Sequence, residues 1–137
     1  MKTKAVATSL CVILLASCTT IHKEHVGAVD PTGIYVLVTV DGTQVPTTAR
    51  HGSHEIEIQS GTFTINNDGT CSSEVIFGPP AGKMQTRVVH AIYTREGAEL
   101  DMKWEGAGRT KGVVEGDNFT MNNEGMIFKY QRKSQVD

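Results

Sequence analysis

FTINNDG at residues 63–69 and FTMNNEG at residues 119–125 are nearly the same heptad, used twice in a chain of 137 residues. Each heptad ends in two Asn residues, one acidic residue and Gly. Asn and Asp side chains hydrogen-bond their own backbone and accept left-handed conformations, which Gly adopts freely. We therefore predict that each heptad is the end of a β-strand followed by a hairpin turn with a glycine bulge.

Calcium binding is the alternative interpretation of the two heptads. An EF-hand loop has Gly at its sixth position and an acidic ligand at its twelfth. When Gly69 or Gly125 is placed sixth, the twelfth residue is Val75 or Gln131, and neither is acidic. The sequence therefore favours two similar hairpins over two calcium sites.

The rest of the chain extends this pattern of strands and turns. From Gly33 onward, turn signals separate short runs rich in Val, Ile, Thr, Phe and Tyr, which is typical of an all-β sandwich or barrel. Leu100, Met102 and Trp104 alternate with charged residues, as expected for a strand with one buried face. We predict an all-β fold, a small antiparallel up-and-down β-barrel of about eight strands, at residues 33–40, 54–66, 70–77, 84–94, 98–104, 109–115, 117–122 and 126–132.

The second of these strands changes its buried face part of the way along. Ile58 is at an even position, whereas Phe63 and Ile65 are at odd positions. All three can face the core only if one extra residue is inserted between them. We predict a β-bulge at Ser60-Gly61, because Gly readily takes a positive φ and a bulge bends the strand as a small closed barrel requires.

The N-terminus has the pattern of a secretory signal peptide. Residues 1–4 include two Lys, and the apolar run at residues 5–16 is shorter than the roughly 20 residues that a membrane-spanning helix needs. The run leads into Leu15-Ala16-Ser17-Cys18, which resembles the lipobox of bacterial lipoproteins. The resemblance implies cleavage before Cys18, a diacylglyceryl group on its thiol and acylation of its new amine, so that the chain is anchored to a membrane.

The lipobox also divides the chain and suggests its location. We expect a signal peptide at residues 1–17, the lipidated Cys18 with a flexible tether at 18–30, a barrel domain at 31–133 and a short tail at 134–137. Residue 19 is Thr, whereas an Asp there would resemble an inner-membrane retention signal. We therefore expect a lipid-anchored protein of the outer membrane that faces the periplasm.

The charge of the chain bears on its binding partners, and its cysteine content bears on disulfide formation. Loss of Lys2 and Lys4 with the signal peptide reduces 13 basic residues to 11 against 15 acidic ones, a net charge of −4. No basic cluster is present, which argues against nucleic acid as a partner, and we expect a monomer. Cys71 is the remaining thiol, so no intrachain disulfide can form and Cys71 is expected to be a small core residue.

Five short stretches suggest the family of the domain. They are the opening Asp30-Pro31-Thr32-Gly33-Ile34-Tyr35, the hairpin Asp41-Gly42-Thr43-Gln44-Val45-Pro46, then Ser60-Gly61-Thr62-Phe63-Thr64, Asn67-Asp68-Gly69-Thr70, and the closing Phe128-Lys129-Tyr130-Gln131-Arg132. With them, residues 30–132 resemble the lipocalin-like (calycin) domains of small bacterial lipoproteins. Tyr35 stands where Trp is usual, and the resemblance implies that Arg132 packs on this first-strand aromatic. The domain is shorter than a typical lipocalin, and no C-terminal helix is expected.

The apolar faces of the strands supply the candidate ligand residues. Eight strands enclose an interior that is just wide enough for side chains or one small ligand, and the bulk of the inward residues favours a filled core. If a cavity exists, the resemblance implies that its lining comes from Tyr35, Phe63, Leu100, Met102, Trp104, Met121, Phe128 and Tyr130. We expect a non-enzymatic binding module for a small apolar ligand, and the alternative is an interaction or inhibitor-type lipoprotein with a filled barrel.

Metal and catalytic chemistry have weak support in the sequence. His51 and His54 are close in sequence and His90 lies in a predicted strand, but a zinc site needs three or four ligands held rigidly. Two exposed loop histidines and one strand histidine are the favoured interpretation. No nucleophile elbow or phosphate-binding loop is present, so we expect no metal, no cofactor and no catalytic residues.

Overall fold

The computed structural model describes residues 29–134, and this part of the chain contains ten strands and no helix. The predicted signal peptide, Cys18 and most of the predicted tether lie outside the described residues. The strands are β1 (Gly33–Val40), β2 (Thr43–Gln44), β3 (Thr47–His51), β4 (His54–Ile65), β5 (Thr70–Gly78), β6 (Gln85–Glu96), β7 (Glu99–Trp104), β8 (Arg109–Glu115), β9 (Asn118–Asn123) and β10 (Met126–Arg132).

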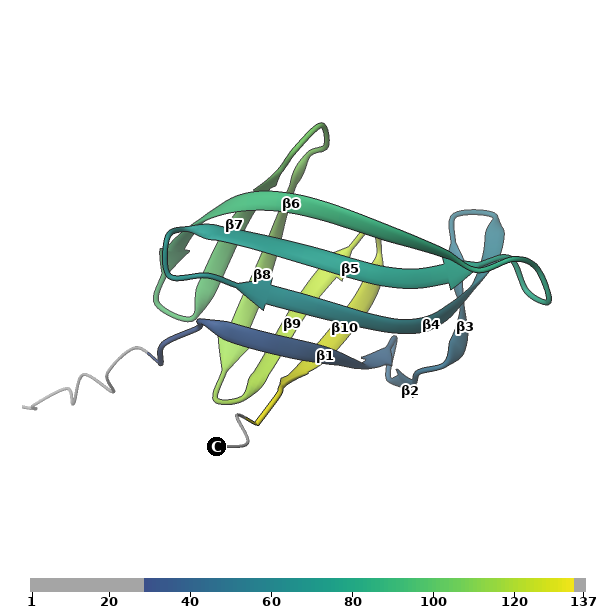
Figure 1. The fold of residues 1–137 in the computed structure, drawn as a ribbon, viewed down its shortest axis with the longest axis horizontal. Helices are drawn as coiled ribbons and strands as arrows, with labels where there is room; N and C mark the ends of the chain where they lie inside the picture. Colours follow the sequence, from purple (N-terminus) through teal and green to yellow (C-terminus); the bar gives the residue numbers. More distant parts are fainter. Residues whose placement is uncertain (1–28, 135–137) are drawn as a thin grey trace, which may run out of the picture.

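The strands close into an antiparallel barrel. Strands β4 to β10 each pair with the next along the chain, β10 pairs with β1, and β1 also pairs with β4. This last pairing joins the two ends of the sheet, so β1 and β4–β10 form a closed barrel of eight strands. Figure 1 shows β4, β5 and β6 running at an angle to β7–β10 on the other side of the barrel. The predicted all-β, up-and-down barrel is confirmed.

The predicted strands agree with the structure to within two residues at each end, and β1, β8 and β10 have the predicted bounds. The sequence predicted the hairpin at residues 41–46 that contains β2, but it did not predict β2 or β3 as strands. Strand β3 pairs with the start of β4, from Thr47 opposite Ile58 to His51 opposite His54. Their residues are largely polar, without the alternation that marks the other strands, which is why a pattern search did not find them.

The predicted bulge in β4 is present but lies one residue earlier. The pairing with β5 shifts between Ile58 and Ser60, so Gln59 is the extra residue. Gly61 does not adopt a positive φ, which corrects the reason given for its presence. A Cβ atom on Gly61 would lie 3.1 Å from the side chain of Leu37, so Gly relieves a tight contact where β1 and β4 approach closely.

The first heptad forms the turn between β4 and β5. Gly69 has a φ of +85°, and the Asn66 backbone N–H donates to the Thr70 carbonyl at 2.9 Å. The Asp68 carboxylate accepts from the backbone N–H of Thr70 at 3.0 Å. These bonds close a three-residue hairpin loop in which Gly69 takes the left-handed position, so the predicted turn with a glycine bulge is confirmed.

The second heptad forms a tighter turn between β9 and β10. Asn123 pairs with Met126, which leaves a two-residue loop of Glu124 at φ +52° and Gly125 at φ +90°. Two positive φ values define a type I′ turn, and the Asn122 side chain accepts from the Gly125 N–H at 2.9 Å. The predicted hairpin is confirmed, but the predicted glycine bulge is wrong for this heptad, because the loop is one residue shorter.

Four aromatic rings fill one half of the barrel, and we call them the aromatic plug. Its members are Tyr35, Phe63, Phe119 and Tyr130, all fully buried. The ring centroids of Phe63 and Phe119 are 4.5 Å apart, and those of Phe63 and Tyr130 are 5.6 Å apart. Burying each such ring stabilises the fold by about 1.5–3 kcal/mol. The plug makes this half of the barrel a solid core.

The N-terminal end of β1 is tied to the plug, and we call this the closed end. The guanidinium of Arg132 lies 5.1 Å from the ring centroid of Tyr35, which is the packing that the resemblance implied. Arg132 also donates to the carbonyls of Asp30 at 2.7 Å and Thr32 at 2.6 Å. The Tyr35 hydroxyl donates to the Pro31 carbonyl at 2.7 Å. The segment that leads into β1, residues 30–32, is therefore held by the side chains of Arg132 and Tyr35.

Candidate ligand-binding site

The other half of the barrel is hollow, and we call this hollow the cup. It has a volume of about 500 Å³, within the range of small-molecule sites, which is about 300–1,000 Å³. Its walls come from β4, β5, β6 and the hairpins β7–β8 and β9–β10. The lining side chains include Ile56, Ile58, Ser73, Val75, Phe77, Arg87, Val89, Trp104, Thr110, Met121, Met126 and Phe128.

The cup exists because the β7–β8 hairpin leaves the barrel wall at its tip. Pairing between β6 and β7 begins only at Ala91 and Trp104, so the first half of β6 has β5 as its neighbour but not β7. Pairing between β8 and β9 likewise stops at Gly112 opposite Met121. Figure 1 shows the β7–β8 tip projecting away from the rest of the barrel. The wall is therefore open on both sides of this hairpin.

Trp104 lies at the boundary between the cup and the plug. Its indole meets the ring of Phe63 edge to face, with centroids 6.1 Å apart, and its other surface lines the cup. The indole N–H donates to the Thr110 hydroxyl at 3.0 Å. This bond satisfies the polar atom of Trp104 within the wall, so the indole offers the cup an apolar surface.

One hydroxyl group lines the cup, and a second lies beside it in the plug. Ser73 lines the cup and is 4% exposed, and it pairs across the strands with Phe63 of the plug. Tyr130 also packs on Phe63, and within residues 29–134 its phenol oxygen has no hydrogen-bond partner. Burial raises the pKa of Tyr130, and the neighbouring Ser73 hydroxyl partly opposes that rise. The phenol is therefore neutral at physiological pH.

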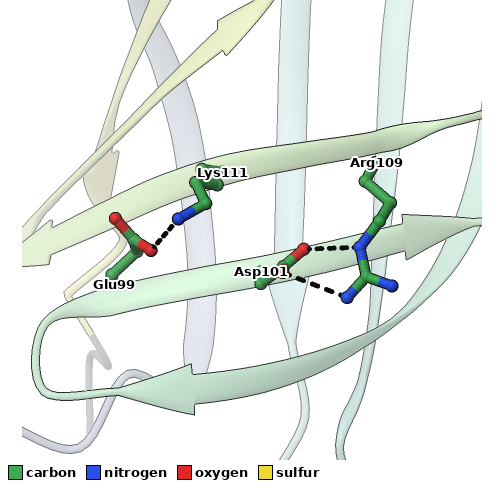
Figure 2. Close-up of polar contacts among 4 residues, drawn as sticks. All are labelled: Glu99, Asp101, Arg109 and Lys111. Atoms are coloured by element: carbon green, nitrogen blue, oxygen red, sulfur yellow. Dashed lines mark hydrogen bonds and ion pairs between the residues drawn. The ribbon is translucent and has the colours of Figure 1, made fainter.

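Charged residues lie around the mouth of the cup. His51 from β3 contacts the carboxylate of Glu124 in the β9–β10 turn. This contact links β3 to the β9–β10 turn across the mouth of the cup. Arg109 is held by Asp101 of the neighbouring strand through bonds of 3.1 and 3.0 Å, as Figure 2 shows. These bonds from Arg109 lower the pKa of the Asp101 carboxyl. Arg87 and Glu105 complete the charged lining.

The cup contains three of the eight candidate ligand residues. Trp104, Met121 and Phe128 line it. The other five lie in or beside the plug, where they are fully buried: Tyr35, Phe63, Leu100, Met102 and Tyr130. The expectation of a filled core therefore holds for one half of the barrel only. Val75 and Phe77 also line the cup, and their alternate positions in the predicted strand 70–77 were the signal that could have identified them.

The structure separates the histidines that could have shared a metal. His51 and His54 face each other across the β3–β4 hairpin, whereas His90 is exposed on β6 and pairs with Ser72. Residues 29–134 contain no group of three or more His, Cys, Asp or Glu side chains that could hold a metal ion. Cys71 is buried in the core, and burial raises the pKa of its thiol to about 12.

The fold and the cup thus define a closed antiparallel β-barrel with one filled end and one hollow end. No protein-family model matches the chain, and neither the curated proteins nor the solved structures searched contain a match to it. In the part of the chain that the structure describes, no helix is long and apolar enough to cross a membrane.

Proposed function

We propose that this protein is a lipocalin-like binding module that holds one small apolar ligand in the cup, without catalysing a reaction. The cup carries the proposal: a space of about 500 Å³ is walled mainly by aliphatic, aromatic and methionine side chains. Ligand sites of this kind are mostly apolar and carry a few polar groups that fix orientation. Ser73 and the charged mouth supply those groups.

The sequence supports the second part of the proposal, which is a lipid anchor at Cys18 in the outer membrane. Acyl chains on Cys18 would hold the protein stably, because two or more chains suffice where one does not. The Cys18→Ser variant is expected to lose membrane attachment and lipoprotein processing. Fractionation with metabolic acyl labelling tests this, and a variant that stays membrane-bound and is cleaved at the same site would refute the lipobox.

Trp104 provides the direct test of ligand binding, because it is the only Trp in the chain and lines the cup. Apolar probes of suitable size should change its fluorescence saturably at micromolar concentration. Phe128→Ala enlarges the cup and should alter the affinity, whereas Lys103→Ala changes an exposed residue next to Trp104 and should not. Native mass spectrometry of protein purified from its own host would then identify a bound ligand.

The alternative function, recognition of another protein, has its own support on the outer surface. Val88 and Ile92 on β6 are 50% and 61% exposed, and exposed apolar side chains that gather on a surface mark interaction sites. If no apolar probe binds in the cup, while Val88→Lys abolishes a defined protein complex, this function replaces the first. If the cup binds probes and Val88→Lys changes nothing, the alternative fails.

A further inference from the structure

The outer surface of β1, β9, β10 and the second half of β4 combines exposed apolar side chains with lysines, and we call it the lysine face. Its large apolar residues, Ile34, Val36 and Ile127, are 48%, 40% and 42% exposed. They point outward because they alternate with buried residues along β1 and β10. The polar members of the face are Thr62, Thr64, Asn118, Thr120, Asn122, Lys129, Gln131 and Lys133.

The pairing of the strands makes the lysine face one continuous surface. Strand β1 lies between β10 and β4, and Val36 is opposite Gln131 on one side and Thr62 on the other. Lys129 of β10 is opposite Thr120 of β9. Residues that are directly opposite across paired strands are close enough for their side chains to touch. The apolar side chains and the lysines are therefore neighbours on the folded protein, although they are far apart in the sequence.

The lysine face differs in charge from the rest of the barrel. Among the described residues that point outward from it, none is acidic. Two acidic residues lie in turns at its border, and both are engaged: Asp41 accepts from the Ile127 N–H at 2.8 Å, and Asp117 lies 3.5 Å from the Arg132 guanidinium. Other acidic side chains of the barrel lie on β5, β6 and β7, at Glu74, Glu96, Glu99 and Asp101. A chain with an excess of acidic residues therefore has one side that is free of them.

We propose that the lysine face rests on the surface of an anionic phospholipid membrane and orients the barrel there. Anionic headgroups attract Lys129 and Lys133, because each Lys near such a surface strengthens binding about fivefold. Ile34, Val36 and Ile127 reach the boundary between headgroups and acyl chains, where apolar side chains leave water. This inference rests on the lipid anchor in the proposed function. It adds the side of the barrel that meets the membrane and the class of lipid that it contacts.

Two observations favour a lipid surface over a protein partner. Cys18 precedes Val29 by 11 residues, which span about 40 Å at most. An anchor at Cys18 would therefore keep the barrel close to the membrane, where weak contacts suffice because the effective concentration is high. The second observation is composition. The cores of protein interfaces are depleted of lysine, whereas Lys129 and Lys133 lie among the apolar residues of this face.

The test places the environment-sensitive dye NBD on the full lipidated chain, through Val36→Cys or Ile127→Cys. Cys71 is buried, and the parent chain measures its background labelling. The control is Ile92→Cys on β6, an exposed apolar position on a strand four places from β10 in either direction around the barrel. On vesicles of phosphatidylethanolamine and phosphatidylglycerol, the dye emission should shift to the blue at positions 36 and 127. At position 92 it should stay as in water.

Charge variants and lipid composition separate the possible outcomes. Lys129→Gln and Lys133→Gln should each lower the ratio of docked to undocked protein about fivefold at low salt, whereas Lys103→Gln on β7 should not. Flotation of the vesicles reports the anchor independently. If the protein floats but the dye reports water at all three positions, the inference is overturned and the anchor stands. An equal blue shift on phosphatidylcholine that grows with protein density would also overturn it, and would indicate that a second copy covers the face. If the protein does not float, the anchor fails and this inference fails with it.

Discussion

The indole of Trp104 stands edge-on to the ring of Phe63, with an interplanar angle of 89°. On one side of this contact the barrel is packed with aromatic rings, and on the other side it is hollow. Edge-to-face pairs are worth about 0.5–1.5 kcal/mol beyond the area that they bury, so the contact fixes Trp104 as the floor of the cup. The solid core and the cup therefore occupy separate halves of one small barrel.

This division predicts different effects for two core substitutions, Met102→Ala and Phe128→Ala. Met102 is fully buried and does not line the cup, so Met102→Ala should lower the free energy of unfolding by about 2–5 kcal/mol and leave ligand affinity unchanged. Phe128→Ala should change affinity as well, because Phe128 lines the cup. Urea denaturation and probe titration of both variants provide the check. A large change in affinity for Met102→Ala would show that the two halves are coupled.

The two heptads predict a specific cost for losing their glycines. Gly69 and Gly125 adopt φ values of +85° and +90°, where a β-branched residue is strained. Gly69→Val and Gly125→Val should each lower the free energy of unfolding by about 1–3 kcal/mol. Glu124→Asn should be tolerated, because Asn accepts a positive φ. Thermal melts with and without calcium complete the experiment, and a calcium-dependent rise in melting temperature would revive the calcium interpretation.

Much of the fold could be predicted because its strands follow a local rule. In strands β8 and β10, more buried and more exposed residues alternate along the whole length, and both were predicted with their observed bounds. The bulge in β4 was predicted from the change of buried face, but its position at Gln59 depends on the pairing with β5. That pairing is a tertiary property, so alternation alone could place the bulge only to within a residue.

The site was harder to predict because it depends on where strands separate. Trp104 and Met102 share one face of β7, yet one lines the cup and the other is buried beside the plug. The difference arises because β7 pairs with β6 only from Glu99 to Trp104. Trp104 is the last paired residue and lies where the two strands separate. Nothing in the local pattern of either strand marks this point. The unsatisfied hydroxyl of Tyr130 likewise becomes visible only when every neighbour is in place.

Arg132 should be worth more to stability than its exposed neighbours. It stacks over Tyr35 and holds the carbonyls of Asp30 and Thr32, so Arg132→Ala removes a cation–π contact and two hydrogen bonds. We expect the free energy of unfolding to fall by about 1–3 kcal/mol. Arg132→Lys should lie between, because Lys cannot reproduce the planar fork. Chemical denaturation measures the free energy of unfolding of each variant, with Lys129→Ala at an exposed position as the control. Equal effects for Arg132→Ala and Lys129→Ala would contradict the stabilising role of the Arg132 contacts.

Cys71 should make the fold more sensitive to alkaline pH. Burial raises the pKa of its thiol from 9.0 to about 12. Between these values the unfolded chain releases a proton that the folded chain keeps, so stability present below pH 9 is lost as the pH rises towards 12. Cys71→Ala should therefore lose less stability than the unmodified protein between about pH 8 and about pH 10.5. Urea midpoints at both pH values measure the difference, and identical losses would show that the thiol ionises freely in the folded state.

Tyr130→Phe provides a last prediction, which needs no ligand. An unsatisfied buried hydroxyl is a cost that the folded protein bears, and its removal should raise the free energy of unfolding by about 1 kcal/mol. Tyr93→Phe should have the opposite effect, because it breaks the bond of 2.6 Å to the Asn66 carbonyl. Both variants remove one phenolic oxygen, so the difference between them isolates the hydrogen bond. Differential scanning calorimetry of the two variants measures it. If Tyr130→Phe is instead destabilising, the neighbouring Ser73 hydroxyl is a hydrogen-bond partner of the phenol, and the hydroxyl is part of the fold.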